Sequence, residues 1–463
     1  MRSNINPAWS RLATAAAIAV VLSLQGKTAE AQTPESYRKL WNDPALTQRI
    51  ERNIEKHRKG DATITVVGPG GRPVNEAAVE VRQQTHEFLF GCNAFVLGQL
   101  DTPEKNRKYE EAFVRLFNFA TVPFYWEGTE PTQGELRYAE GSRDMWRRPP
   151  PDRFIPFAKQ HGITLKGHPL LWHAYNPGWL PKDAEALKKL YQKRFAEIAG
   201  RYAKDIKIWD VVNESLCSSK AYPLYTPDRA YVAWAFREVA PLFGPDNRLM
   251  INEVNFSNCS VGDANPYYRQ VKQLLADGVK VQGVGFQFHF FSPAALKGLG
   301  GAGYAPQKLL DAYDSFAAFD RPLFVTEITF PTPADNGQAA QAELAGNFYK
   351  LWFSVPRMAG ITWWNLGDGT AVKGENKALG GLIDEKFDPK ESYRTLDRLI
   401  NQQWRTRLSA KTDSQGVFRF RGFYGKYAVK VTAAGKTQEF PIYLAKDGPA
   451  EYQLTMTEKE GTK

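Results

Sequence analysis

Two glutamates stand at the ends of apolar runs and could do acid–base or nucleophilic chemistry. Glu214 ends the run IKIWDVVNE, and Glu327 lies near the end of LFVTEITF. Two carboxyl groups that face one reacting atom can work as proton donor and nucleophile, provided that one is protonated and the other ionised. Seven further candidates lie at the ends of similar runs: His168, Trp172, Asn213, Asn252, Gln287, His289 and Trp364.

Each of these side chains also has an ordinary structural interpretation. A single Glu at a strand end usually marks the exit from the core, and a single His in an apolar strand is more often a buried, hydrogen-bonded residue. Their joint occurrence argues for a site, because burying so many polar groups without mutual hydrogen bonds would cost several kcal/mol. The chain has six His and three Cys and no Cys-x-x-Cys pattern, so neither a metal nor a cofactor is expected.

The runs that carry these residues recur eight times between residues 88 and 400. They are FLFGCNAF (88–95), FNFATVPFYW (117–126), TLKGHPLLWH (164–173), IKIWDVVNE (206–214), RLMINEVN (248–255), VQGVGFQFHF (281–290), LFVTEITF (323–330) and GITWWNLG (360–367). Helix-like segments such as residues 183–203 lie between them, and this alternation predicts a (β/α)8 TIM barrel. An open doubly wound sheet is the alternative, but the sequence lacks the Gly-rich phosphate-binding turn typical of its first strand.

In such a barrel, functional side chains gather at the carboxyl ends of the strands. Glu214 would end the fourth strand and Glu327 the seventh, so their carboxyl groups would face each other across the ring. This arrangement fits cleavage of a glycosidic bond, in which one acid protonates the leaving oxygen and the other attacks the anomeric carbon. A separation of about 5–5.5 Å favours retention of configuration, whereas a wider gap admits a water molecule and favours inversion.

Three segments flank the barrel. Residues 1–31 combine basic residues, an apolar run and small residues up to Ala31, which is typical of a cleaved signal peptide and of a secreted or periplasmic protein. Residues 32–87 form a polar lead-in followed by a β-hairpin that turns at residues 68–71. Residues 401–463 alternate with period two, which predicts a small all-β module beside that hairpin.

Composition narrows the functional classes. The 463 residues are 43% hydrophobic, enough for a sizeable core, and the net charge of +10 is spread without a basic run, so no nucleic-acid partner is expected. The apolar stretch of residues 12–24 is too short for an ordinary membrane span. Of the cysteines Cys92, Cys217 and Cys259, at least one stays free, and a disulfide between the last two fits the predicted strand ends. The oligomeric state is left open.

Several motifs together resemble glycoside hydrolase family 10, the family of the endo-β-1,4-xylanases. They are WDVVNE, GHPLLWH, NEVN, GVGFQFH, VTEI and the closing GGLIDEKFDPKESY, in the family's order and spacing over about residues 88–400. The later segment TDSQGVFRFRGFYGKY is similar to the β tail of plant-type and some bacterial relatives. The resemblance implies a (β/α)8 barrel and a retaining mechanism.

The resemblance also implies roles for single residues near the cleaved bond. Glu214 matches the acid/base, and Asn213 before it matches the residue that holds the sugar 2-hydroxyl. Glu327 matches the nucleophile. His289 matches the His that hydrogen-bonds the nucleophile, and Gln287 lies beside it.

Four further residues would bind sugar if the resemblance holds. His168 and Trp172 match residues that clasp the glycone sugar next to the cleaved bond, and Trp364 would be the platform above that sugar. Asn252 falls on the acceptor side. The implied partner is a xylan-like polysaccharide.

The sequence departs from the family's pattern mainly on the glycone side. Residues 121–126 lack the Glu, Asn and Lys that bind the next glycone sugar. Tyr175 stands where a Gln is often found, and Thr329 replaces the Asp that supports His289. The second Trp expected after the eighth strand is missing from GDGTAVKG. A decorated xylan, another β-glycoside, or a short or exo-type substrate therefore stays open beside ordinary xylan.

Three hypotheses of function follow from these residues. The first is an exported β-glycanase that acts on xylan-like polysaccharide. The second is a carbohydrate-binding barrel that has lost catalysis; loss of either glutamate would favour it, and both glutamates are present. The third is a barrel that performs transglycosylation in preference to hydrolysis, which the sequence does not separate from the first.

Overall fold

The computed structural model describes residues 33–254, 260–332 and 337–457, so the predicted signal peptide at residues 1–31 lies outside the described residues. Eight parallel strands form a closed ring, as the eight apolar runs predict. They are β3 (Leu89–Asn93), β4 (Phe119–Pro123), β5 (Thr164–His168), β7 (Ile208–Asn213), β8 (Arg248–Val254), β9 (Gly283–His289), β10 (Leu323–Thr329) and β11 (Met358–Trp363). The ring closes through pairing of β5 with β7, and the short β6 (Leu171–Trp172) also pairs with β7.

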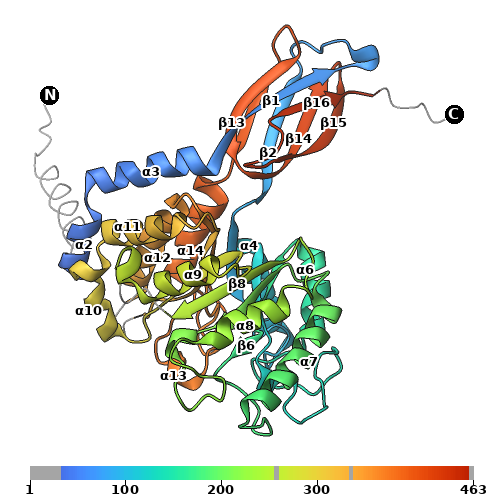
Figure 1. The fold of residues 1–463 in the computed structure, drawn as a ribbon. Coiled ribbons are helices and arrows are strands. Elements are labelled where there is room, and N and C mark those ends of the chain that lie inside the picture. The colour runs from blue at the N-terminus through green and yellow to red at the C-terminus, as the bar shows by residue number, and fades with distance from the viewer. Residues whose placement is uncertain (1–32, 255–259, 333–336, 458–463) are drawn as a thin grey trace, which may run out of the picture.

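Helices surround the ring (Figure 1). The longer ones are α3 (Pro44–Arg58), α4 (Pro103–Leu116), α6 (Phe154–His161), α7 (Ala184–Tyr202), α8 (Ala230–Val239), α9 (Pro266–Ala276), α11 (Pro306–Ala317), α12 (Gln338–Ser354) and α14 (Glu391–Arg398). Shorter helices are α2 (Glu35–Trp41), α5 (Trp126–Thr129), α10 (Leu296–Leu299) and α13 (Lys373–Asn376). In the described part of the chain, none of the helices has the length and apolar character needed to cross a membrane.

The sequence of α7 shows why these segments become helices. Asp183 precedes the first turn and accepts a hydrogen bond from the backbone N–H of Ala186 at 2.8 Å, which satisfies a donor that would otherwise lack a partner. Leu187, Tyr191 and Phe195 recur at intervals of four and are buried on one face. This apolar stripe packs the helix against the strands and leaves its charged face in water.

Apolar side chains close the amino end of the ring. Phe119, Ile208, Met250 and Phe324 come from β4, β7, β8 and β10 and form a buried cluster of their own near the starts of these strands. Because strands of a parallel barrel are buried on both faces, their sequences are nearly continuous apolar runs. The polar exceptions therefore collect at the opposite, carboxyl end.

The remaining strands form a two-sheet sandwich beside the barrel (Figure 1). They are β1 (Lys59–Val67), β2 (Ala78–His86), β12 (Arg407–Lys411), β13 (Val417–Phe423), β14 (Gly425–Ala433), β15 (Lys436–Leu444) and β16 (Glu451–Thr455). One sheet has the order β13-β1-β16, and the other has the order β12-β2-β14-β15. Ile64 and Val66 of β1 pack between the sheets with Val79 and Val81 of β2.

This arrangement corrects the predicted hairpin at residues 61–87. The two strands exist and are joined through residues 68–71, but they lie in different sheets. Among the described residues, the pairing between the two arms is a single bridge of Val67 with Pro73. The physical reason is burial, because a lone hairpin leaves its apolar face in water, whereas two facing sheets cover each other. Strands from the two ends of the chain therefore share one module.

Candidate active site

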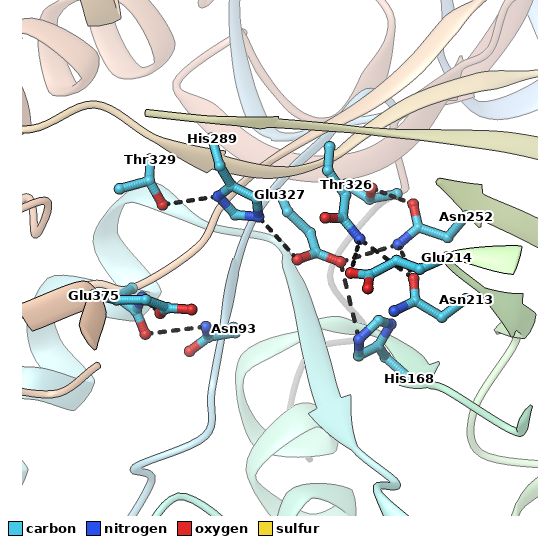
Figure 2. Close-up of polar contacts among 12 residues, drawn as sticks. Asn93, His168, Asn213, Glu214, Asn252, His289, Thr326, Glu327, Thr329 and Glu375 are labelled. Atoms are coloured by element: carbon cyan, nitrogen blue, oxygen red, sulfur yellow. Dashed lines mark hydrogen bonds and ion pairs between the residues drawn. The ribbon is translucent and has the colours of Figure 1, made fainter. Parts of the chain in front are cut away.

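The carboxyl ends of the barrel strands bring the predicted side chains together (Figure 2). Glu214 directly follows β7, and its backbone is left-handed with φ of 53°. Glu327 lies within β10. The two carboxyl groups come from different walls of the ring and point into the same gap, as the sequence predicts. Glu327 is 4% exposed, while Glu214 is only partly buried and is more open to a ligand.

Three side chains from different strands hold the Glu327 carboxyl group. Asn252 donates a hydrogen bond from Nδ2 to Oε1 at 2.9 Å, and His289 Nε2 lies 3.1 Å from Oε2. His168 Nε2 is 3.9 Å from Oε1. Burial raises the pKa of Glu327 to about 8, although His168 and Lys166 act in the opposite direction. A carboxylate fixed on both oxygens has little freedom to turn, which suits a group that must attack one atom.

Buried charged residues hold the His168 side chain in position. The carboxyl oxygen Oδ2 of Asp210 lies 2.6 Å from Lys166 Nζ and 2.7 Å from His168 Nδ1. Burial alone would raise the pKa of Asp210, but Lys166 and His168 outweigh it and hold this pKa below its ordinary value. The ionised Asp210 therefore fixes the imidazole by accepting from Nδ1, which leaves Nε2 directed at Glu327.

Two donors fix the Glu214 carboxyl group. Trp172 donates from Nε1 to Oε2 at 3.1 Å, and Gln287 donates from Nε2 to Oε1 at 3.0 Å. The backbone N–H of Glu214 donates to Asn252 O at 2.9 Å. Gln287 also lies 3.3 Å from Asn213 Oδ1, so the same side chain touches both residues of the Asn-Glu pair.

Asn252 links the two halves of the site. It is completely buried and donates to Asn213 Oδ1 at 2.9 Å as well as to Glu327. Its own Oδ1 accepts from Thr326 Oγ1 at 2.5 Å. Asn213 Nδ2, by contrast, is buried and has no hydrogen-bond partner among the described residues. An unpaired donor beside two carboxyl groups is available to a ligand oxygen.

Thr329 takes over the support of His289. Thr329 Oγ1 lies 3.0 Å from His289 Nδ1, on the ring edge opposite Glu327. Burial lowers the pKa of His289 to about 4, so the ring is neutral near pH 7. In a neutral ring only one nitrogen carries a proton, and the ionised form of Glu327 needs it at Nε2. The Thr329 hydroxyl then donates to Nδ1, which preserves the hydrogen bond but adds no negative charge.

Glu253 is a third carboxyl group near the pair, and its sequence position predicts no role for it. It is fully buried, and Oε1 accepts from Ser215 Oγ at 2.6 Å and from the backbone N–H of Leu216 at 2.9 Å. Its other oxygen, Oε2, is buried without a partner among the described residues. Burial raises the pKa of Glu253 to about 7. It holds the turn that follows Glu214.

Aromatic rings form the wall between β11 and β6. Trp364 is 5% exposed and meets His168 edge-on, with ring centroids 5.7 Å apart. Trp172 and Tyr125 both stack on Tyr175, at centroid distances of 5.1 and 5.3 Å. Trp172 and Trp364 therefore lie beside the carboxyl pair, and their contacts with a sugar stay a prediction. Tyr125 was missed, because it lies in the segment whose motif departs from the family.

A second polar network lies farther from Glu214 and was also missed. Arg147 donates from Nη1 to Asn365 Oδ1 at 2.8 Å, and Asn93 Nδ2 lies 3.3 Å from the same oxygen. Asn365 in turn donates from Nδ2 to Glu375 Oε2 at 3.3 Å. Asn93 ends β3, so the strand-end rule that found the other residues could have found it. Arg147 lies on a loop and Glu375 on the short helix α13 within the loop after β11, and the sequence offers no such rule for either position.

Two further points concern the cysteines and a possible metal site. Cys217 is exposed and unpaired in the described part, and its predicted partner Cys259 lies outside it, so the disulfide stays a prediction. Across residues 33–254, 260–332 and 337–457, no cluster of three His, Cys, Asp or Glu side chains is arranged to hold a metal ion.

Comparison with known proteins gives two relatives of different kinds. Endo-1,4-beta-xylanase 3 of Hypocrea jecorina is 30% identical over 283 residues, which cover 58% of this chain and 71% of that protein. The anti-sigma-I factor RsgI6 of Acetivibrio thermocellus is 25% identical over 423 residues, which cover 90% of this chain. Because the alignment covers only 49% of RsgI6, this chain spans about half the length of that relative.

A solved structure and a family profile match the barrel. The crystal structure of xylanase 10B from Thermotoga petrophila in complex with xylobiose shares the fold, with a TM-score of 0.56 and 24% identity over 68% of this chain and 95% of that one. A sequence profile described as Glycosyl hydrolase family 10 matches residues 97–398, well over half of the chain. The chain, with its paired glutamates at the carboxyl end of a closed parallel barrel, belongs to glycosyl hydrolase family 10.

Proposed function

We propose that this protein is an exported, retaining β-glycoside hydrolase that cleaves a xylan-like β-1,4-linked polysaccharide by double displacement. The observation that carries the proposal is the joint placement of Glu214 and Glu327. Asn252 bonds to Glu327 and to Asn213, and Gln287 bonds to Asn213 and to Glu214, so one chain of hydrogen bonds ties the two carboxyl groups together. Relatives such as the Hypocrea jecorina endo-1,4-beta-xylanase support the substrate class.

In the first step, Glu327 reacts in its ionised form, which its raised pKa makes the less populated form at neutral pH. It attacks the anomeric carbon while the bond from that carbon to the leaving oxygen breaks. Glu214 gives its proton to the leaving oxygen, so the departing sugar chain leaves as a neutral alcohol. Trp172 and Gln287 keep the Glu214 carboxyl group directed into the gap. Asn213 Nδ2, which has no protein partner in the described chain, is free to bind the sugar 2-hydroxyl.

In the second step, Glu214 works in the reverse direction. It takes a proton from a water molecule, whose oxygen attacks the anomeric carbon, and the bond to Glu327 breaks. The charge returns to Glu327, where the hydrogen bonds from Asn252 and His289 stabilise it. His168, fixed by Asp210, lies against the same carboxyl group. Two inversions at one carbon restore the original configuration.

The glycone side favours a restricted substrate as a second candidate. The Glu, Asn and Lys expected within residues 121–126 are absent, and Tyr125 occupies this wall, stacked on Tyr175 with Arg148 4.0 Å above its ring centroid. Such a wall favours a decorated xylan or a short β-glycoside over a long unsubstituted chain. A panel of linear and decorated polysaccharides, assayed for new reducing ends, separates the two candidates.

The stereochemical course tests the proposal directly. Proton NMR recorded during early turnover of a xylo-oligosaccharide should show the β anomer appearing first, before mutarotation produces the α anomer. An α anomer released first would mean inversion and would refute Glu327 as a nucleophile. Absence of any hydrolysis across the panel would leave a carbohydrate-binding barrel, or a transglycosylase if oligosaccharides lengthen instead.

A further inference from the structure

Glu375 occupies a position that the catalytic pair does not explain. It belongs to α13, in the loop after β11, and it is partly exposed. In the closed ring, whose order is β5-β4-β3-β11-β10-β9-β8-β7, β11 lies diametrically opposite β7, the strand that presents Glu214. Figure 2 shows Glu375 and Asn93 on the side of the gap away from Glu214, with His289 and Glu327 between the two sides.

The Glu375 carboxyl group is held in place from one side only. Its Oε2 accepts from Asn365 Nδ2, and Asn365 is itself fixed by Arg147 at 2.8 Å and Asn93 at 3.3 Å. Arg147 and Asn365 are 4% and 6% exposed, so this support is buried. Within the described chain, the one hydrogen bond of the Glu375 carboxyl group is that to Oε2, so Oε1 has no hydrogen-bond partner. One oxygen is therefore fixed by the protein, and the other is available at the edge of the gap.

The direction of the substrate places this free oxygen on the glycone side. If Glu214 protonates the leaving oxygen, the departing sugars lie on the β7 side. The retained sugar would then lie between Glu327 and Trp364, and its neighbour would extend towards β11 and β3. A partly exposed carboxylate there accepts hydrogen bonds from sugar hydroxyls, and such charge-assisted bonds are strong. It repels a uronic acid at the same position, because two negative charges would then lie close together.

We propose that Glu375 binds a hydroxyl of the second glycone sugar and that this sugar is neutral. This inference rests on the proposed function, because it requires that Glu214 and Glu327 cleave a β-glycoside. Glu375 thereby takes the part of the polar residues that are absent from residues 121–126. Asn365 and Arg147 are positioning residues, since they hold Glu375 and contact the sugar only through it.

Two aryl glycosides that differ by one sugar test the proposal. The 4-nitrophenyl β-xyloside fills only the position next to the cleaved bond, whereas the 4-nitrophenyl β-xylobioside also reaches the second glycone position. Glu375→Ala should lower kcat/KM for the xylobioside about 10–100-fold, the range expected for one lost hydrogen bond to a charged group. The same variant should change kcat/KM for the xyloside by less than about two-fold. Glu375→Gln, which can still accept from Asn365 and bind a hydroxyl, should lose less.

The matched control is Glu385→Gln, which removes an exposed carboxylate and should leave kcat/KM unchanged for both substrates. Equal losses on both substrates, or no loss on either, would overturn the role of Glu375 while leaving the proposed function intact. Faster xylobioside turnover in Glu375→Ala would also overturn it, by showing that the side chain blocks the second sugar. Failure of the unmodified protein to cleave either glycoside would refute the proposed function, and the role of Glu375 with it.

Discussion

The burial of Glu327 predicts that Glu327→Gln makes the protein more stable, and increasingly so as the pH rises. The folded state raises the pKa of Glu327 from the ordinary 4.5 to about 8. Between these values the folded protein keeps a proton that the unfolded chain has released, so the stability of the unmodified protein falls with rising pH. This loss of stability is absent below the pKa that Glu327 has in the unfolded chain, and it is complete above the pKa that Glu327 has in the folded protein. Glutamine cannot ionise and carries no such cost.

The magnitude follows from the two pKa values. Each pH unit inside the window costs about 1.4 kcal/mol, so the advantage of Glu327→Gln should grow by roughly 2–3 kcal/mol between pH 5 and pH 7. The glutamine can satisfy both of its neighbours. Its carbonyl accepts from Asn252, and its amide donates to His289 Nε2 once the neutral ring moves its proton to Nδ1 and donates to Thr329.

Urea unfolding at constant ionic strength, followed by tryptophan fluorescence at pH 5, 6 and 7, measures this difference. Glu385→Gln serves again as the control, because an exposed carboxylate should give the same pH dependence as the unmodified protein. Parallel stability curves for Glu327→Gln and the unmodified protein would refute the reasoning, since Glu327 would then have the same pKa in the folded and unfolded states.

Three further predictions address neighbouring groups. Glu214→Ala should slow glycosides with poor leaving groups by orders of magnitude and activated aryl glycosides far less, as steady-state kinetics on the two classes will show; an equal loss on both would argue against a proton donor. Thr329→Asp should raise the pKa of His289 from about 4, because a carboxylate then faces Nδ1. An unshifted histidine titration by NMR would show that the side chain at position 329 does not contact this ring. Glu253→Ala should lower the unfolding free energy by about 2–4 kcal/mol, because Ser215 Oγ and the Leu216 N–H lose their acceptor and a cavity opens. Glu253→Gln keeps an acceptor oxygen and should lose less stability. Equal urea midpoints for the two variants would contradict this reasoning.

The barrel could be predicted because burial on both faces leaves a plain mark on the sequence. Runs such as LFVTEITF are apolar except where a side chain reaches the carboxyl end, so Glu327 stood out against its neighbours. The sandwich could be predicted only as strands. Alternation in β1 and β2 shows which face of each strand is buried, but the pairing partner is set by contacts more than 300 residues away, such as Thr63 with Arg419.

The site divides in the same way. Residues on strands, such as Asn213, Gln287 and His289, could be predicted because the barrel fixes where strand ends meet. Arg147 and Glu375 could not, because their positions depend on loop conformations that no periodicity encodes. The expected contact of Asn252 with the acceptor sugar stays a prediction, and the sequence did not predict that Asn252 also donates to both Asn213 and Glu327.

The interleaving of β1 and β2 with the C-terminal strands makes the barrel an insertion inside another small domain. During synthesis, β1 and β2 emerge first and wait for partners until the whole barrel has been made. Once paired with β13 and β14, they hold the first and last residues of the barrel segment close together. This pairing lowers the conformational entropy of the segment between them, as closing a loop does. Deleting residues 401–463 would therefore leave β1 and β2 without their pairing partners. Their unpaired backbone N–H and C=O groups would be free to pair with another chain, so the shortened protein should self-associate.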